Sequence, residues 1–479
     1  MNVLLVYKDT MIERLAVTYL SAALKAAGHK VRLAVLGPTP AKAFPKLVGD
    51  FAPRVIGYSA MTGEHTALLE LNRTLKRSFD FLAVLGGPHA TFRQDVLGEE
   101  GLDAICVGEG DSVFPEFCRR VEAGEAWWLT LTFHAKHDGN IFKNPLAPFV
   151  DMTALPAPDR AILFEAPPKL TGLGIKAFIA GRGCPYRCSY CFNAKFNEDY
   201  KGLGKVMRAR QPSQVVTEIA QVRDQTGVEL VAFWDDVFTV KPKGWVEDFC
   251  RLYKDRIGLP FYCNMRANSV NEAVVEELAK AGLKFVFMGV ECGNERIANE
   301  ILERNLSNEK VVAAARILQK HRVGIATQNL IGLPVPDPYP VDLETLDLNI
   351  IIKPTYAWSS ILYPYPGTPI EAYARSHGFL DEDAAYIETN KRTTMLNFKS
   401  PVVRRRIENL HKLFGLVVRF PRLRPYVTFL CDLPLGGLYR VFYYVWYGYN
   451  LKFRLNRSRA VWRELPYLLG IFWRMVVKN

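Results

Sequence analysis

Short apolar runs alternate with amphipathic stretches twice along this chain of 479 residues, and a proline-rich stretch separates the two series. In residues 1–125, five apolar runs have the length and composition of strands, and stretches with apolar residues at helical spacing lie between them. This alternation predicts an α/β domain with a doubly wound, Rossmann-like parallel sheet over residues 1–143. We expect its ligand site where loops leave the carboxyl ends of the strands.

The second series, residues 174–399, contains six candidate strands separated by helical stretches. Six β/α units are too few to close an eight-stranded barrel, so the pattern predicts an open, partial (β/α)6 barrel with active groups where strands pass into loops. Between the two series, residues 144–173 contain six prolines. Proline-rich chain continues neither a sheet nor a helix, which predicts an interdomain linker.

Residues 400–479 follow neither pattern. From residue 401 onward the chain has 15 Lys and Arg, 3 Asp and Glu and 16 aromatic residues, so this region accounts for the whole net charge of +12. No segment reaches the roughly 18 to 20 uninterrupted apolar residues that span a bilayer. A basic, aromatic-rich helical region favours peripheral contact with an anionic membrane surface. The alternative is a helical cap that packs its aromatic side chains on the barrel and exposes its arginines.

The cellular compartment is predicted from the N-terminus and the cysteines. The first residues, MNVLLVY, are typical of a strand and too short for a signal peptide. The chain has nine cysteines, of which six lie singly, as in proteins of a reducing cytoplasm. We therefore expect a cytoplasmic protein, peripheral at the inner face of the membrane. Its apolar tail gives no reason to expect a nucleic-acid partner.

The other three cysteines lie close together in the stretch GRGCPYRCSYCFN, at Cys184, Cys188 and Cys191, directly after the first strand of the second series. A structural zinc site takes four Cys or His ligands, and no histidine occurs between His137 and His321. A four-iron cluster held by three thiolates leaves one iron free to bind a small molecule. The C-x3-C-x2-C spacing therefore favours a 4Fe–4S cluster over zinc.

With Tyr190 before its last cysteine, this motif resembles the signature of the radical S-adenosylmethionine (radical SAM) enzymes. The stretches MRARQPSQVVTEI, GVECGNERI, NLIGLP and YPYPGTP resemble motifs of the subgroup with an N-terminal cobalamin-binding domain, and the resemblance extends over most of residues 1–375. It implies three cofactors, namely a 4Fe–4S cluster, SAM and cobalamin, and an electron donor of the flavodoxin or ferredoxin type. In this family an electron from the cluster cleaves SAM to a 5′-deoxyadenosyl radical, which abstracts hydrogen from the substrate.

The resemblance also implies residues that contact SAM. Arg210 is a candidate for the SAM carboxylate and Glu291 for the ribose or amino group, while Asp235 and Asp236 are expected at the mouth of the barrel. For Arg208 and Arg210 the alternative is pairing with acidic residues of the next helix. The full set of candidate SAM contacts is Tyr190, Arg210, Asp236 and Glu291.

The N-terminal sheet is similar to the cobalamin-binding fold, where glycine lets the backbone approach a bulky ligand closely. The cobalamin motif D-x-H-x-x-G is absent, so the resemblance implies that no histidine binds cobalt from below. His65 and His89 could be proposed instead, but a loop histidine is more often solvated or a hydrogen-bond partner. The positions that match cobalamin contacts are Ser59, Thr62, Gly86, Gly87, Pro88, Gly108, Glu109 and Gly110.

Together these features predict an enzyme that methylates an unactivated carbon of a hydrophobic, lipid-like small molecule. One SAM would supply the methyl group through cobalamin, and a second SAM, cleaved at the cluster, would make the substrate radical. One alternative is cyclisation, oxidation or rearrangement with the same cofactors and no methyl transfer. Another is a membrane-peripheral iron–sulfur protein that catalyses no reaction. No residue in the sequence decides between methylation and the other radical reactions.

Overall fold

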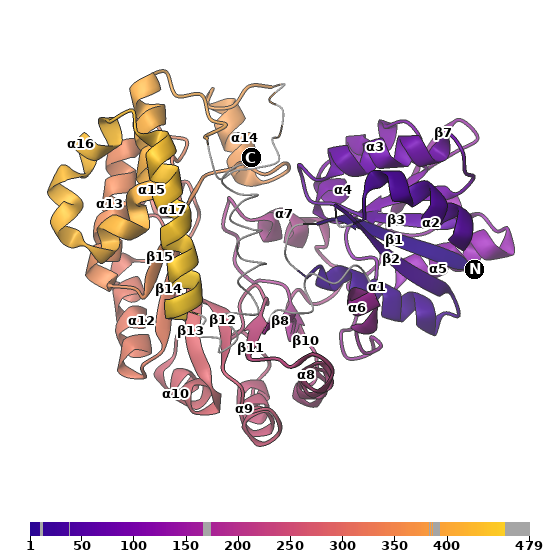
Figure 1. The fold of residues 1–479 in the computed structure, drawn as a ribbon, viewed down its shortest axis with the longest axis horizontal. Coiled ribbons are helices and arrows are strands. Elements are labelled where there is room, and N and C mark those ends of the chain that lie inside the picture. The colour runs from indigo at the N-terminus through magenta and orange to yellow at the C-terminus, as the bar shows by residue number, and fades with distance from the viewer. Residues whose placement is uncertain are drawn as a thin grey trace. The chain divides into compact units, whose positions relative to one another are not determined.

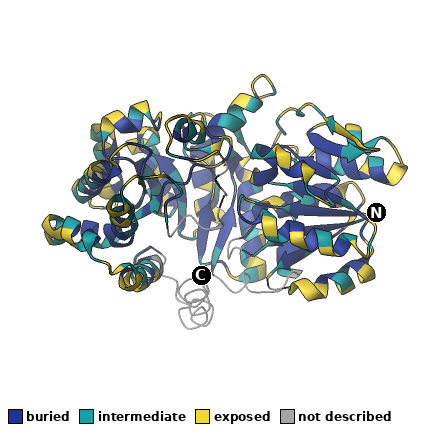
Figure 2. Cartoon of the chain, turned by 90° about the horizontal axis from the view of Figure 1, so that it is seen from above, coloured by how far each residue is buried: buried dark blue, intermediate teal, exposed yellow. Residues whose placement is uncertain are grey.

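The computed structural model describes residues 1–9, 13–37, 39–165, 174–382, 384, 386 and 393–455. The chain divides into two compact units. Unit 1 consists of Met1–Gly172 and Phe196–Arg208, and unit 2 of Leu173–Lys195 and Ala209–Asn479. In each unit the strands are mostly buried, whereas exposed residues gather on the outer sides of the helices (Figure 2).

Unit 1 is built on one seven-stranded sheet, in the order β2-β1-β3-β4-β5-β6-β7. Strands β1 to β5 are parallel, which confirms the doubly wound sheet predicted from the sequence. The hairpin β6–β7 extends the sheet in antiparallel fashion and was not predicted. The strands are β1 (Asn2–Lys8), β2 (Lys30–Leu36), β3 (Val55–Ser59), β4 (Leu82–Gly86), β5 (Ala104–Cys106), β6 (Phe133–His137) and β7 (Asn140–Lys143).

Helices cover both faces of this sheet (Figure 1). Successive strand residues point to opposite faces, so Leu4 and Val6 pack under α2, α3 and α4, and Val3 and Leu5 pack under α1, α5 and α6. The helical segments are α1 (Leu15–Ala26), η1 (Ala41–Ala43), α2 (Phe44–Phe51), α3 (His65–Lys76), α4 (Pro88–Phe92), η2 (Gln94–Gly98), α5 (Val113–Ala123), η3 (Trp127–Leu129) and α6 (Ala161–Glu165).

The proline-rich stretch packs on unit 1 as far as it is described. Met152 and Ile162 are almost completely buried. The Asp159 carboxylate accepts a hydrogen bond of 2.6 Å from the Ser21 hydroxyl and lies 2.6 Å from the Lys25 ammonium. The part of the predicted linker before residue 166 is therefore tied to the N-terminal sheet, and residues 166–173 lie outside the described residues.

Unit 2 contains a six-stranded, wholly parallel sheet in the order β15-β14-β13-β12-β11-β8. All six strands predicted from the sequence are present, and β8 and β15 are the two edges, which confirms the partial, open barrel. Its strands are β8 (Ile175–Phe178), β11 (Leu230–Phe233), β12 (Phe261–Arg266), β13 (Leu283–Glu291), β14 (Gly324–Ile331) and β15 (Tyr356–Ile361), and the short strands β9 (Gly181–Arg182) and β10 (Arg208–Ala209) lie outside this sheet.

The helices between these strands begin and end at residues that favour helix termini. Pro212 opens α8 behind a capping box formed by Gln211 and Gln214, and Gly227 ends it in a left-handed conformation. Asn271 caps α10 by accepting from the Ala273 backbone N–H at 3.0 Å. The helical segments are α7 (Phe192–Asp199), α8 (Pro212–Thr226), α9 (Trp245–Arg256), η4 (Ala267–Ser269), α10 (Glu272–Ala281), α11 (Glu295–Glu300), α12 (Asn308–Lys320), α13 (Pro338–Ile352) and α14 (Pro369–Ser376).

The basic C-terminal region is helical over its described part, as predicted. Its first helix, α15 (Pro401–Arg419), packs on β15 and α13 through buried residues such as Leu410 and Phe414. The segments η5 (Pro421–Tyr426), α16 (Val427–Asp432), α17 (Gly436–Tyr449) and the π-helix η6 (Asn450–Leu455) follow, and residues 456–479 lie outside the described residues. Among the described helices, none has the length and apolar composition needed to cross a membrane.

A buried carboxyl joins the turn after β14 to α13. Asp342 is fully buried and accepts hydrogen bonds of 2.9 and 3.1 Å from the Gly332 backbone N–H. Burial raises the pKa of Asp342 well above its usual value. Above the unfolded pKa, near about 4, the unfolded chain loses a proton that the folded chain keeps, so this group lowers stability as pH rises towards the folded pKa.

We expect Asp342→Asn to reduce this loss of stability, because the amide oxygen still accepts from Gly332 and cannot ionise. The free energy of unfolding of wild type should fall relative to that of the variant from about pH 5 to about pH 8, by at most about 1.4 kcal/mol per pH unit. Urea denaturation at both pH values measures this difference. Asp248→Asn, at a position with a 61% exposed side chain, is the control. Parallel pH profiles for wild type and Asp342→Asn would contradict the assignment.

Candidate active site

The three clustered cysteines lie in the loop between β9 and α7 of unit 2. Cys184 and Cys191 are partly exposed, and Cys188 is buried. The loop is fixed from both sides by Ser189. The Ser189 backbone N–H and hydroxyl donate to the carbonyls of Leu302 and Ile301 at 3.1 and 2.5 Å, and its carbonyl accepts from the Ile370 N–H at 3.0 Å. The loop is therefore held by the segment after α11 and by the start of α14.

Burial stabilises the protonated form of two of the three loop thiols. Burial raises the pKa of Cys184 to about 11 and that of Cys191 to about 12, and the neighbouring Cys188 thiol raises both further. A metal must therefore displace their protons on binding. The remaining six cysteines are all buried, and none of them contributes to the pKa shift of Cys184 or Cys191. Three thiolates in one loop are the donor set of a cluster with one open iron.

A single metal ion is a different kind of site. In the described part of the chain, no three His, Cys, Asp or Glu side chains come close enough to hold one ion together.

A buried polar cluster lies against the cysteine loop. Arg304 donates to the Tyr190 hydroxyl at 2.6 Å and to the Gly289 carbonyl at 2.5 Å, and its guanidinium lies 3.6 Å from the Glu291 carboxylate. Glu291 has a φ of +66°, a conformation that is rare for residues with a side chain and costs energy. Burial raises the pKa of Glu291, and Arg304 opposes this shift. Tyr190 and Glu291, which the sequence analysis predicted as SAM contacts, thus both contact the guanidinium of Arg304. The sequence analysis did not identify Arg304.

A second arginine that the sequence analysis missed lies at the end of β12. The guanidinium carbon of Arg266 lies 3.8 Å from the ring centroid of Tyr186, in the cysteine loop, and Arg266 also donates to the Arg304 carbonyl. Its Nε is buried and has no hydrogen-bond partner among the described residues. Arg266 also lowers the pKa of Cys184. The loop therefore has a cation with an unused donor beside it.

Arg210, the predicted carboxylate ligand, is 4% exposed and ion-paired with Glu218 of α8. Its carbonyl accepts from the Trp245 indole at 2.7 Å. Arg210 therefore forms the pair with an acidic residue of the next helix that the sequence analysis gave as the alternative to SAM binding. Arg208 instead pairs with Glu109, as described below.

The two aspartates after β11 differ in their contacts. Asp235 is almost fully buried and accepts from the Ala180 N–H and the Lys241 ammonium, both at 2.8 Å. Asp236 accepts from the Asn193 amide at 3.0 Å, and burial raises its pKa. Asn193 follows Cys191 by two residues, so Asp236 contacts the cluster loop whereas Asp235 supports the strand ends.

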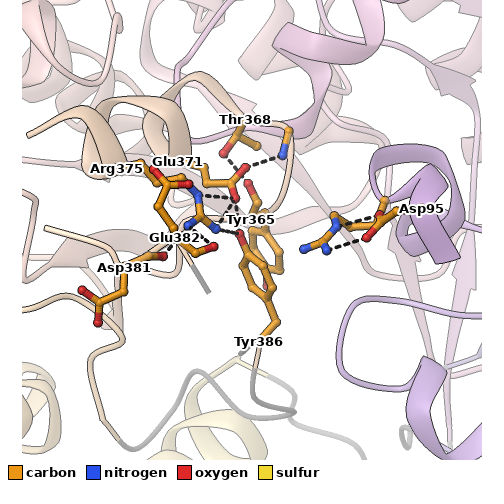
Figure 3. A network of polar contacts seen from close by, with 10 residues as sticks. Asp95, Tyr365, Thr368, Glu371, Arg375, Asp381, Glu382 and Tyr386 are labelled. Atoms are coloured by element: carbon orange, nitrogen blue, oxygen red, sulfur yellow. Dashed lines mark hydrogen bonds and ion pairs between the residues drawn. The ribbon is translucent and has the colours of Figure 1, made fainter. Parts of the chain in front are cut away.

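The loop after β15 adds aromatic side chains to unit 2. The rings of Tyr363 and Tyr365 lie 5.0 Å apart, and those of Tyr363 and Tyr386 lie 5.9 Å apart. Tyr386 donates to Glu371 of α14, which also pairs with Arg375 at 2.9 Å (Figure 3). Tyr365 is 43% exposed. Polar contacts thus fix Tyr386 while Tyr365 keeps an accessible apolar ring.

In unit 1, Ser59 is the last residue of β3 and Thr62 follows that strand, while Gly86 is the last residue of β4 and Gly87 follows it. The Thr62 hydroxyl lies 3.2 Å from Nδ1 of His89. The rings of His65 and His89 stack with centroids 3.6 Å apart. Burial lowers the pKa of both histidines, that of His89 to about 3. Both are therefore neutral near neutral pH, and these positions stay predictions for cobalamin.

The glycine turns are also required by packing within unit 1. Gly87 has a φ of +92°, and a Cβ there would lie 2.8 Å from the Ala60 carbonyl oxygen. Gly108 has a φ of +104°, and a Cβ there would overlap the Tyr200 hydroxyl. The Glu109 carboxylate accepts from Arg208 at 2.6 and 2.8 Å. The close approaches at both glycines are therefore to the protein's own backbone and side chains.

Two family models match the chain. The B12 binding domain matches residues 3–118, and the Radical SAM superfamily matches residues 178–343. An uncharacterized methyltransferase of Pyrococcus horikoshii is 24% identical over 83% of this chain and 87% of its own length. The anaerobic magnesium-protoporphyrin IX monomethyl ester cyclase of Rubrivivax gelatinosus is 27% identical over 66% of this chain, which spans 58% of that relative. The hopanoid C-3 methylase of Methylococcus capsulatus is 24% identical over 74% of this chain and 68% of its own length.

Solved structures of two enzymes share the fold. The cobalamin-dependent S-adenosylmethionine radical enzyme OxsB superposes with a TM-score of 0.72 and 17% identity over 99% of this chain and 75% of its own. The radical S-adenosylmethionine methyltransferase TsrM of Kitasatospora setae gives a TM-score of 0.64 and 16% identity over 78% of this chain and 76% of its own. The family models and the cysteine motif together show that this chain is an enzyme of the cobalamin-dependent radical SAM family, whose cofactors are a 4Fe–4S cluster, SAM and cobalamin.

Proposed function

We propose that this enzyme methylates a carbon atom of a hydrophobic substrate and receives electrons from a donor of the flavodoxin or ferredoxin type. The observation that carries the proposal is the loop of three thiols without a fourth, fixed beside two buried arginines. When bound, the cofactors supply the methyl group and the means to remove hydrogen from an unactivated carbon. The names of two relatives, a methyltransferase and a methylase, support methyl transfer.

Different residues in and beside the cysteine loop would bind the cluster and SAM. Cys184, Cys188 and Cys191 would hold the cluster. Arg266 is the better candidate for the SAM carboxylate, because its Nε has no hydrogen-bond partner in the described structure whereas Arg210 is ion-paired with Glu218. Asp236 would meet the positively charged amino group, since it lies beside the loop.

Two features support a hydrophobic substrate reached at a membrane. The tyrosines after β15 offer an aromatic wall at the carboxyl edge of the sheet. On α17 and η6, apolar side chains recur every three or four residues, so they share one side of the helix, and they are 42–57% exposed. The region that carries them is also basic, which favours anionic lipid. These side chains are Leu438, Val441, Phe442, Val445, Tyr449 and Phe453.

The rival function is ring formation by the same cofactors without methyl transfer. One relative is named as a cyclase and is 27% identical, slightly more than the methyltransferase. An experiment with SAM labelled in its methyl group separates the two. The full chain, reconstituted anaerobically and reduced with dithionite, is incubated with a membrane lipid extract and labelled SAM.

Methylation predicts label in the lipid fraction and equal amounts of S-adenosylhomocysteine and 5′-deoxyadenosine. Substrate-dependent 5′-deoxyadenosine without label in any product would overturn methylation and favour the rival. Failure to cleave SAM with any extract, despite a full complement of iron, would favour a non-catalytic iron–sulfur protein. Label in water-soluble products alone would overturn the hydrophobic substrate and leave methylation in place.

A further inference from the structure

A groove runs between α15 and α17 in the C-terminal helices. Its volume is about 270 Å³, and Lys412 is its single charged wall residue. Ligand sites in proteins are mostly apolar and contain few polar groups that fix the orientation of the ligand. The other walls are the side chains of Leu413, Leu416, Phe442, Val445, Trp446 and Tyr449.

Neighbouring groups compensate the charge of Lys412 only in part. The residue is nine-tenths buried, and its ammonium makes no hydrogen bond or ion pair with any described residue. Burial lowers its pKa, Glu408 raises it, and Arg440 lowers it further. Lysine side chains are rarely this deeply buried, because the ammonium is strongly hydrated.

The start of α17 adds to this positive site. A Cβ on Gly436, the first residue of α17, would lie 3.4 Å from the Lys412 ammonium, so the charge lies beside the helix N-terminus. No side chain caps this 14-residue helix, and its first turn has no acidic residue. The N-terminus of a helix carries partial positive charge and free backbone donors.

The indole of Trp446 also lines the groove. The indole Nε1 of Trp446 is buried without a hydrogen-bond partner among the described residues. The lysine ammonium and the helix N-terminus both donate and neither accepts, so a ligand that satisfies them must offer acceptor atoms.

We infer that this groove binds a single-chain amphiphile with an anionic headgroup. The headgroup, a carboxylate or a phosphate, meets Lys412 and the first turn of α17, and the apolar tail lies between α15 and α17 towards Tyr449. Charge complementarity and the apolar walls both favour this class of ligand over a peptide or a free anion. The inference does not depend on the reaction that the enzyme catalyses.

Binding of cis-parinaric acid, a fluorescent fatty acid, to the delipidated full chain tests the inference. Palmitic acid and palmityl phosphate should displace the probe, palmityl alcohol should do so about tenfold more weakly or less, and acetate and inorganic phosphate should not displace it. Which of the two acids competes more strongly identifies the headgroup. No binding of the probe, or equal competition by acid and alcohol, would overturn the inference. Binding only to vesicles that contain anionic lipid would overturn it as well.

Two variants locate the site. Lys412→Met should weaken binding of palmitic acid by about tenfold or more and change binding of palmityl alcohol by less than about twofold. Leu416→Trp, which fills the groove, should weaken both. Lys243→Met, at an exposed position outside the C-terminal helices, is the matched control. Equal affinities of Lys412→Met and Lys243→Met for palmitic acid would overturn the inference, provided that both bind iron like wild type.

Discussion

Replacing Cys184, Cys188 or Cys191 by alanine is expected to abolish the iron–sulfur cluster and, with it, cleavage of SAM. Each thiolate would hold a different iron, and the six remaining cysteines are buried and cannot replace it. After anaerobic reconstitution, iron should fall from about four atoms per chain to below about one. Formation of 5′-deoxyadenosine should fall by at least about 1,000-fold, because the cofactor supplies the chemistry.

Cys250→Ala is the matched control for this prediction. Cys250 is 5% exposed in α9 and makes no contribution to the pKa shifts of Cys184 and Cys191. Its replacement should lower stability through a small cavity and leave iron content and the visible absorbance of the cluster unchanged. Full iron in any variant of the three loop cysteines, or equal loss of iron in Cys250→Ala, would contradict the assignment of the ligands.

Replacing Arg304 by methionine is expected to have the largest effect on stability. Arg304 is 3% exposed and joins Tyr190, Gly289 and Glu291. Its loss leaves the buried Glu291 carboxylate without its counter-charge, which typically costs about 3–5 kcal/mol. We expect a decrease of this size in the free energy of unfolding, measured by urea denaturation of the cofactor-free chain.

The double variant Arg304→Met with Glu291→Gln distinguishes loss of the charge pair from loss of packing. If the unpaired carboxylate causes the decrease, adding Glu291→Gln should restore part of the stability, and the two substitutions should not be additive. Tyr190→Phe removes one neutral acceptor and should cost about 1–2 kcal/mol. Additive effects of the Arg304 and Glu291 substitutions would show that the pair contributes little.

The regular parts of the fold could be predicted because their signals are local. Each of the five parallel strands of unit 1 and the six of unit 2 is an apolar run followed by a helical pattern, and the order of alternation determines a parallel sheet. The hairpin β6–β7 had no such signal. Phe133–His137 and Asn140–Lys143 are short and polar, and their pairing depends on the edge that β5 offers.

The same distinction applies to the candidate site. The three cysteines and Tyr190 lie within eight residues of one another, so the spacing alone reveals them. Arg304 was missed because it contacts Tyr190 across 114 residues, and Arg266 because its aromatic partner, Tyr186, lies 80 residues away in sequence. The pair Arg210–Glu218 spans eight residues, and the local alternative of pairing with the next helix described it correctly.

Unit 1 is built from two separate segments of the chain, which limits how the protein can be cut into fragments that fold. Phe196–Arg208 belongs to unit 1 although unit 2 residues precede and follow it in the sequence. Within this segment the Tyr200 ring stacks on Phe149 at 4.1 Å, and Arg208 pairs with Glu109. An N-terminal fragment that ends within the proline-rich stretch would lack Tyr200 and Arg208. The cobalamin-binding half is thus a discontinuous domain, and during synthesis it can complete its packing only after the cysteine motif has left the ribosome.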